Sequence, residues 1–278
     1  MKASIRAQKH LWTVVVLGAL LPTAAGAEGR PPDSAPEGWH TEATLYLYLP
    51  SFGGTTRYPE EPGLDFDVST SQILDSLQMV FMGMLDVRNG KWGGFTDVMF
   101  LDLAASKSNT RSFTIGNGAL PADTTADLNL AIKGWSWTLA GEYQVVADPG
   151  LRVDLLGGAR FFNVRSRLDW AISGSLGPIS PSGRTGSSEA GGPVWDGIIG
   201  AKGSLNLDAG RKWSIPFYVD AGTGGSVYTW QAAAGVSYAF KWGSLSAMWR
   251  YLDYKFEAPT DIETFNLNGP LVAATFRW

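Results

Sequence analysis

Charged residues alternate with apolar ones in a run that could place acids and bases side by side. In LDVRNGKWGGFTDV, residues 85–98, Asp86, Arg88 and Asp97 stand among leucine, valine and tryptophan. Successive side chains of a β-strand point to opposite faces, and Asn89-Gly90 is a strong signal for a two-residue hairpin. Folded there, the run collects its charges on one face. Such a face can form ion pairs or line a water-filled path that selects ions.

The same alternation recurs along the chain and defines a set of inward-facing charges. From the strand parity, five of them are expected at mid-height or above: Asp97, Arg160, Lys202, Asp220 and Arg250. Six are expected nearer the end with the short turns: Glu42, Asp86, Arg88, Glu142, Asp154 and Arg277. Asp196 belongs to the same face. Two interpretations stay open: a neutralising ion-pair network that fills a narrow interior, or a conducting path.

Ten segments with this period must position the charges. They are residues 38–49, 79–88, 92–100, 134–146, 151–162, 194–207, 212–222, 229–240, 244–254 and 269–278. Short connections alternate with mostly longer ones, and an even number of strands suits a closed antiparallel meander. The sequence therefore predicts an all-β fold, a closed up-and-down transmembrane β-barrel of about ten strands. The range is eight to twelve, because residues 53–68 are compatible with an extra hairpin.

Aromatic residues on the apolar face decide which face meets water. One group lies near short turns or termini: Trp39, Trp92, Tyr143, Trp213, Phe240 and Trp278. A second group lies toward the long connections: Phe100, Phe161, Trp195, Trp230 and Tyr251. From Trp92 to Phe100 the strand rises roughly 26 Å, or about 20 Å when tilted by ~40°, near the ~25 Å apolar band of a membrane barrel. Two such girdles predict that the apolar face meets lipid.

The N-terminus predicts export. Lys2, Arg6 and Lys9 precede an apolar run of about eleven residues, and Ala25-Gly26-Ala27 resembles a signal-peptidase site. We expect a signal peptide at 1–27 with cleavage after Ala27, a flexible leader at 28–38 and a barrel at 39–278. Removing 1–27 takes three of the 22 basic residues and none of the 26 acidic ones, so the net charge falls from −4 to about −7. Such an acidic chain is a poor partner for nucleic acid.

Other motifs give no site for catalysis, a cofactor or a metal. His40 is the only histidine beyond residue 27, and it is expected at the start of the first strand, far from an outer rim. Asp65 and Asp67 begin like a calcium loop, but Thr70 stands where that loop needs glycine. We expect neither an enzyme nor a bound cofactor or metal. Residues 69–78 predict a short helix, either folded inward or packed over the rim.

The C-terminal FRW, ending in Trp278, resembles the last strand by which bacterial outer-membrane proteins are recognised by their assembly machinery. The chain thus looks like a Gram-negative outer-membrane β-barrel. FMGMLDVRNGKWGGFTDVMFLDL, DLLGGARFF, VWDGIIGAKG and GPLVAATFRW resemble segments of a family of uncharacterised proteobacterial outer-membrane proteins, a likeness that implies no reaction. The resemblance implies outer-membrane lipid and that assembly machinery as partners.

The expected function is a narrow passive channel for a small solute or ion, or a structural barrel with a charged interior. The alternatives are a surface adhesin or receptor that acts through its extracellular loops, and a lipid-modifying outer-membrane enzyme. The single histidine disfavours the enzyme.

Overall fold

The structure is a computed structural model, and it describes residues 38–56, 65–71, 75, 77–107, 114–115, 118–119, 125–173, 184–257 and 262–278. The chain divides into two units, Met1–Pro31 and Pro32–Trp278. The first unit lies outside the described residues, so the signal peptide and its cleavage stay predictions. Within the described part of the chain, no helix is both long and apolar enough to cross a membrane.

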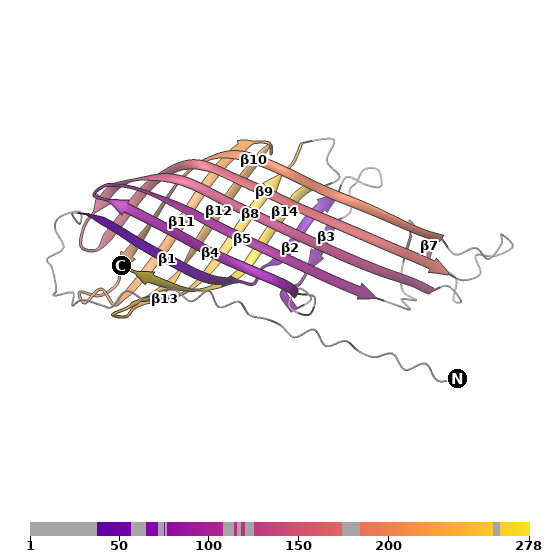
Figure 1. Cartoon of the computed structure of the whole chain (residues 1–278), viewed down its shortest axis with the longest axis horizontal. Coiled ribbons are helices and arrows are strands. Elements are labelled where there is room, and N and C mark those ends of the chain that lie inside the picture. Colours follow the sequence, from indigo (N-terminus) through magenta and orange to yellow (C-terminus); the bar gives the residue numbers. More distant parts are fainter. Residues whose placement is uncertain are drawn as a thin grey trace. The chain divides into compact units, whose positions relative to one another are not determined.

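Ten antiparallel strands close into a barrel (Figure 1). In order around the barrel they are β1 (Trp39–Tyr48), β4 (Leu77–Asn89), β5 (Trp92–Lys107), β8 (Thr125–Ala147), β9 (Leu151–Ser173), β10 (Arg184–Asn206), β11 (Trp213–Gly224), β12 (Tyr228–Ala239), β13 (Gly243–Lys255) and β14 (Ile262–Arg277). The last strand pairs with the first, with Ala43 opposite Phe276 and Leu47 opposite Val272. The predicted fold class is confirmed.

In the described part of the chain, four short strands add to these ten. After Pro50 the chain continues as β2 (Ser51–Thr56), which pairs with the first half of β14 and forms a hairpin with β3 (Asp65–Val68). This is the extra hairpin with which residues 53–68 are compatible. A separate two-stranded sheet joins β6 (Thr114–Ile115) and β7 (Gly118–Ala119).

The β4–β5 hairpin corrects the predicted register. Its two loop residues are Gly90 and Lys91, because Asn89 pairs with Trp92. Gly90 has a positive φ of 59°, which suits the first loop position of a tight hairpin turn. Partners are shifted by two residues from the prediction, so Met84 faces Asp97. Because side chains alternate with a period of two, a two-residue shift leaves each on its predicted face.

Strands β8, β9 and β10 are each 23 residues long and run well past the other strands in Figure 1. The sequence interpretation ends the corresponding segments near residues 134, 162 and 194 and assigns most of the chain beyond those points to loops. That assignment is wrong at residues 125–127, 169–173 and 184–193, which belong to the three strands. Beyond the aromatic girdle, positions in line with the outer face become polar, as at Lys133, Arg165 and Arg167. The apolar outer face therefore ends there, while the backbone pairing continues as far as Thr125 opposite Ser173.

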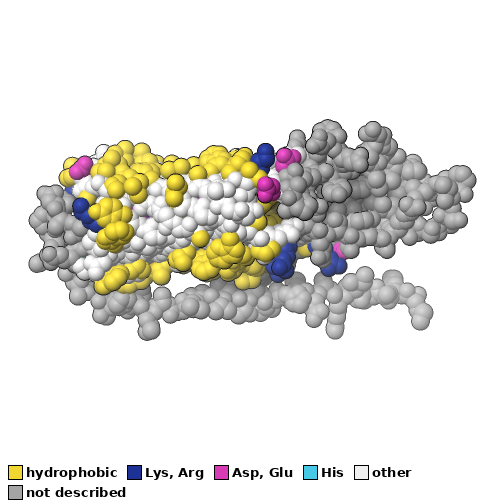
Figure 2. All heavy atoms as spheres, turned by 90° about the horizontal axis from the view of Figure 1, so that it is seen from above, with side chains coloured by type: hydrophobic (Ala, Val, Ile, Leu, Met, Phe, Trp, Pro, Cys, Tyr) yellow, Lys and Arg dark blue, Asp and Glu magenta, His cyan; other side chains and the backbone are white. Residues whose placement is uncertain are grey.

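The exterior of the barrel is apolar between its two ends. Figure 2 shows hydrophobic side chains along the visible wall and charged side chains gathered near the ends. Large side chains such as Leu139, Leu155 and Ile199 are more than half exposed. The buried polar set, which includes Glu142 and Asp154, faces inward instead. An apolar exterior around a charged interior is the arrangement of a membrane barrel, the inverse of a soluble one.

The predicted helix at 69–78 is described only in part. Thr70, Ser71 and Asp75 have helical backbone. Ser69 is not helical, and Leu77 and Gln78 already belong to β4, so the predicted helix is wrong at both ends. Residues 72–74 and 76 lie outside the described set.

Candidate functional site

Inward-facing side chains divide the lumen into layers along the barrel axis. We name four of them, starting from the end with the short turns. The lower charged layer is Asp86, Arg88, Glu142, Asp154 and Lys202, and the lower apolar layer is Phe95, Ala140, Leu156 and Ile198. The upper charged layer is Asp97, Arg160, Asp220 and Arg250, and the upper apolar cluster includes Phe52, Met82, Met99, Phe162, Tyr254, Phe265 and Leu267.

Strand parity creates this layering. On β8, Glu142, Ala140, Thr138 and Ser136 follow one another at every second position, and each belongs to the next layer up. β9 follows a similar order, from Asp154 through Leu156 and Gly158 to Arg160. Because alternate residues share a face, successive inward residues of one strand lie two positions apart and at successive heights in the lumen.

The lower charged layer is a continuous ion-pair network. Arg88 donates to a Glu142 carboxylate oxygen at 2.9 Å and to an Asp154 oxygen at 2.8 Å. Lys202 pairs with both Asp86 and Glu142. The side chains of Glu142 and Asp154 are fully buried. Such burial is tolerable only because each carboxylate meets a base.

Lys202 corrects a sequence prediction. The expected position is at mid-height or above, with Arg160 and Arg250. The structure instead sets Lys202 opposite Asp154 in the β9–β10 register, so its amine reaches the lower charged layer.

The upper charged layer contains two pairs. Arg160 pairs with Asp220 and also donates to the Thr138 hydroxyl at 3.2 Å, and both charged side chains are fully buried. Arg250 donates to Asp97 at 3.1 Å and to the Gln231 amide oxygen at 2.8 Å.

Tyrosines complete this upper charged layer. The Tyr46 hydroxyl donates to Asp97 at 2.6 Å, and the Tyr218 hydroxyl donates to Asp220. Neither tyrosine was predicted from the sequence as a polar partner. Both could have been identified from the sequence, because each tyrosine falls on the charged face of its strand and its neighbours in the chain fall on the apolar face.

Two predicted lumen residues stand outside the central layers. Asp196 is buried and accepts hydrogen bonds from the backbone N–H and the hydroxyl of Ser226, each at 2.9 Å. Glu42 and Arg277 form a 3.0 Å pair at the end with the short turns, where both are partly exposed. Within the described residues, no three potential ligands are grouped so that they could hold a metal ion.

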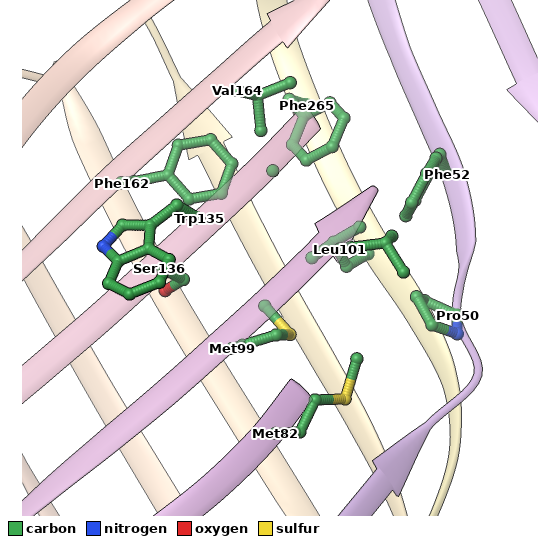
Figure 3. Close-up of a pocket in the computed structure, with 12 residues that line it drawn as sticks. Pro50, Phe52, Met82, Met99, Leu101, Trp135, Ser136, Phe162, Val164 and Phe265 are labelled. Atoms are coloured by element: carbon green, nitrogen blue, oxygen red, sulfur yellow. The ribbon is translucent and has the colours of Figure 1, made fainter. Parts of the chain in front are cut away.

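The upper apolar cluster fills the lumen above the charges. Phe162 stacks on Tyr254 with ring centroids 4.2 Å apart, and Phe265 packs against Phe162 at 5.6 Å. A cavity of about 30 Å³ remains beside them. Met82 and Met99 border it from β4 and β5 (Figure 3). That volume holds one or two water-sized groups.

The eleven predicted girdle residues all lie on the outer face of the barrel. Those near the short turns are well exposed, with Trp39 at 72% and Trp92 at 69%. Rings on neighbouring strands touch, as in Trp92 with Tyr143 at 4.7 Å and Phe161 with Trp195 at 5.0 Å between centroids. Four aromatic residues that the sequence prediction left out of the girdles also contact girdle rings: Trp135 contacts Phe100, Trp137 contacts Trp195, Tyr238 contacts Trp213 and Trp242 stacks on Phe240.

The turn between β10 and β11 is held by a carboxylate. Asp208 accepts hydrogen bonds from the backbone N–H of Trp213 at 2.6 Å and of Lys212 at 3.2 Å. The bond from Trp213, with smaller contributions from Lys212 and Gly210, lowers the pKa of the Asp208 carboxyl. The site is a solvent-exposed turn outside the lumen.

No protein-family model and no curated protein matches the chain. Among solved structures, the translocator domain of the autotransporter NalP from Neisseria meningitidis is 16% identical, with 89% of this chain and 91% of that one covered and a TM-score of 0.42. The outer membrane protease OmpT from Escherichia coli is 10% identical, with coverages of 91% and 99% and a TM-score of 0.47. The attachment invasion locus protein Ail of Yersinia pestis is 11% identical, with coverages of 87% and 99% and a TM-score of 0.30.

All three TM-scores lie below 0.5, so neither the fold nor the function of this chain is inferred from them. The resemblance to a family of uncharacterised outer-membrane proteins gains no support from any of these matches.

Proposed function

We propose that this chain is an integral outer-membrane β-barrel whose lumen is closed by its own side chains. Membrane placement is supported by the apolar exterior, by the two aromatic girdles and by the closure of β14 on β1. In hydrocarbon, every backbone N–H and C=O needs a partner within the protein, and strand pairing supplies one along most of the wall. The predicted signal peptide and the C-terminal Trp278 favour export to the outer membrane of a Gram-negative cell.

The single observation that carries the closed lumen is the burial of its charges. Glu142, Asp154, Arg160 and Asp220 are each at most 2% exposed, although they lie on the face that a water-filled path would have to wet. A conducting path keeps its lining charges hydrated, whereas the buried charges of this lumen form ion pairs with one another. Of the two interpretations left open by the sequence, the structural barrel with a neutralised interior is the better supported.

Planar-bilayer recording tests this proposal. The purified full-length mature chain is refolded, inserted into a planar bilayer and recorded under an applied voltage, with a general porin refolded in the same way as the positive control. We expect no conductance steps above the baseline. Steps of constant size that change when Arg160 or Arg250 is replaced by alanine would show that the lumen conducts and would refute a closed barrel.

A second function, binding at the cell surface, is favoured by the length of β8–β10. These strands continue past Trp135, Phe161 and Trp195 of the girdle by about ten residues, or roughly 30 Å of three-stranded sheet. Shortening β9 and β10 symmetrically, with the barrel left intact, tests this role. Loss of adhesion by cells that still display a heat-resistant barrel supports surface binding, and unchanged adhesion contradicts it.

A further inference from the structure

The barrel wall is interrupted beside β4. Pairing of β1 with β4 runs from Trp39 opposite Asn89 to Leu45 opposite Gly83 and then stops. Among the described residues, Leu77–Met82 have no strand partner on the side away from β5. We call this interruption, between Leu77–Met82 and the chain from Tyr46 to Ser51, the seam. From Phe52 to Thr55 the corresponding side of β2 is paired with β3.

Side chains replace backbone partners at the seam. The Tyr48 backbone N–H, which would otherwise point to β4, donates to the Met82 sulfur at 3.2 Å. The Leu49 carbonyl accepts from the Thr70 hydroxyl at 3.3 Å. A bond to a thioether is weaker than one to a carbonyl. The two edges of the wall are therefore joined less firmly here than along the paired part of β1 and β4.

The cavity in the upper apolar cluster lies directly behind the seam. Pro50 and Phe52 border it from one edge, and Met82 borders it from the other (Figure 3). Apart from Ser136, its lining is almost entirely apolar. The methionines are unbranched and flexible, so the space can widen without moving the backbone.

The cavity also lies at the height of the aromatic girdle on the side of the long connections. Met99 and Leu101 of its lining flank Phe100, and Phe162 follows Phe161. On the outer surface beside it, Met79 and Phe81 of β4 are more than half exposed. In a membrane, this part of the wall faces the hydrocarbon of the outer leaflet.

From this geometry we propose that the cavity is the inner end of a binding site for one linear acyl chain, which enters from the outer leaflet through the seam. An acyl chain is the apolar molecule present at this height. The narrow 30 Å³ cavity suits the end of a chain rather than a ring system. None of its lining residues is charged, which disfavours a polar solute. The site depends on the membrane placement proposed above.

Photolabelling with a fatty acid that carries a diazirine near its terminal methyl tests the proposal. The full mature barrel in lipid vesicles is labelled and the adducts are mapped by mass spectrometry. We expect adducts on lumen residues such as Phe162 and Met99 that an excess of unlabelled palmitic acid abolishes. Adducts confined to exterior residues such as Leu139 would show a barrel in the membrane without this site. A complete lack of adducts would contradict the membrane placement as well.

Two methionines on one strand provide a matched pair of variants. Met82 borders the cavity, whereas Met84 faces the lumen two residues nearer the short turns and packs against the lower apolar layer. Met82→Ala enlarges the site, and each methylene that newly fits should tighten binding about fourfold. Met84→Ala should leave the half-saturating concentration of the label unchanged. Equal effects of the two variants would refute this location of the site.

Closing the seam tests the route of entry. The chain has no cysteine. Leu47 and Phe81 would be the next outward pair after Leu45 and Gly83, so oxidised Leu47→Cys/Phe81→Cys joins the two edges without touching the lumen. We expect lumen labelling to fall at least tenfold and to return on reduction. The control Ala43→Cys/Leu85→Cys bridges residues that already pair and should have no effect. Unchanged labelling in the oxidised seam variant would overturn lateral entry.

Discussion

The Arg160–Asp220 pair allows the closed lumen to be perturbed most sharply. Both side chains are fully buried. In Arg160→Leu the Asp220 carboxylate keeps the Tyr218 hydroxyl but loses the base with which it pairs. Removing one partner of a buried ion pair typically costs about 3–5 kcal/mol, because the remaining charge stays buried without compensation. We expect the free energy of unfolding to fall by about that amount.

The double variant separates pairing from packing. In Arg160→Leu/Asp220→Leu no charge is stranded, and replacing a buried pair by apolar residues is often neutral or stabilising. We expect it to recover at least about 2 kcal/mol of the loss in the single variant. The exposed pair provides the control, since Arg277→Leu should cost only about 0–1 kcal/mol.

The assay is reversible unfolding in denaturant with lipid vesicles present, followed by tryptophan fluorescence. Additive losses in the double variant, or a loss below about 1 kcal/mol in Arg160→Leu, would refute the reasoning. Either result would mean that water, rather than the opposite charge, compensates these side chains.

Three other perturbations test separate parts of the structure. Leu139→Arg places a charge on the outer face between the girdles and should cost about 2–4 kcal/mol in vesicles, whereas a negligible cost would indicate a water-facing wall. Phe162→Ala removes the ring stacked on Tyr254 and should cost about 3–5 kcal/mol of unfolding free energy; a loss under about 1 kcal/mol would mean that the cluster is loosely packed. Because hydrogen bonds lower the pKa of Asp208, its stabilisation is complete above the unfolded pKa of about 3.9 and is lost as the pH falls through the folded value. The free energy of unfolding of Asp208→Asn should therefore be lower than that of the wild type at neutral pH and should approach it in acid. A difference that does not change with pH would contradict that role.

The face on which each strand residue lies could be predicted from the sequence, because a pairing register that is wrong by two residues leaves the alternation of side chains unchanged. The predicted β4–β5 turn was displaced, yet Asp86 and Arg88 kept their inward face and Trp92 its outward one. Only a shift by an odd number of residues would have exchanged the faces. The height of the girdles could also be predicted, because aromatic residues lie near short turns and short turns are easy to locate in a sequence.

Features that depend on contacts between distant strands could not be read in this way. Periodicity assigns Lys202 to a face but not to a height, which the register with β9 sets. The extensions of β8–β10 lose the apolar outer face at residues such as Lys133 and Arg165, and that face was the signal by which strands were located. The seam arises where β1 leaves β4 at Leu45, and no residue near that point carries a signal for it.

Cysteine accessibility tests the central claim, a lipid-facing wall around a closed lumen, most directly. The chain offers a cysteine-free background. In vesicles, Thr138→Cys in the upper charged layer should resist a charged, water-soluble thiol reagent, and Leu139→Cys beside it should react only with a membrane-soluble one. His40→Cys at the exposed strand start should react with both. Rapid reaction of Thr138→Cys with the charged reagent would reveal a water-filled lumen, and the same reaction at Leu139→Cys would place the outer wall in water.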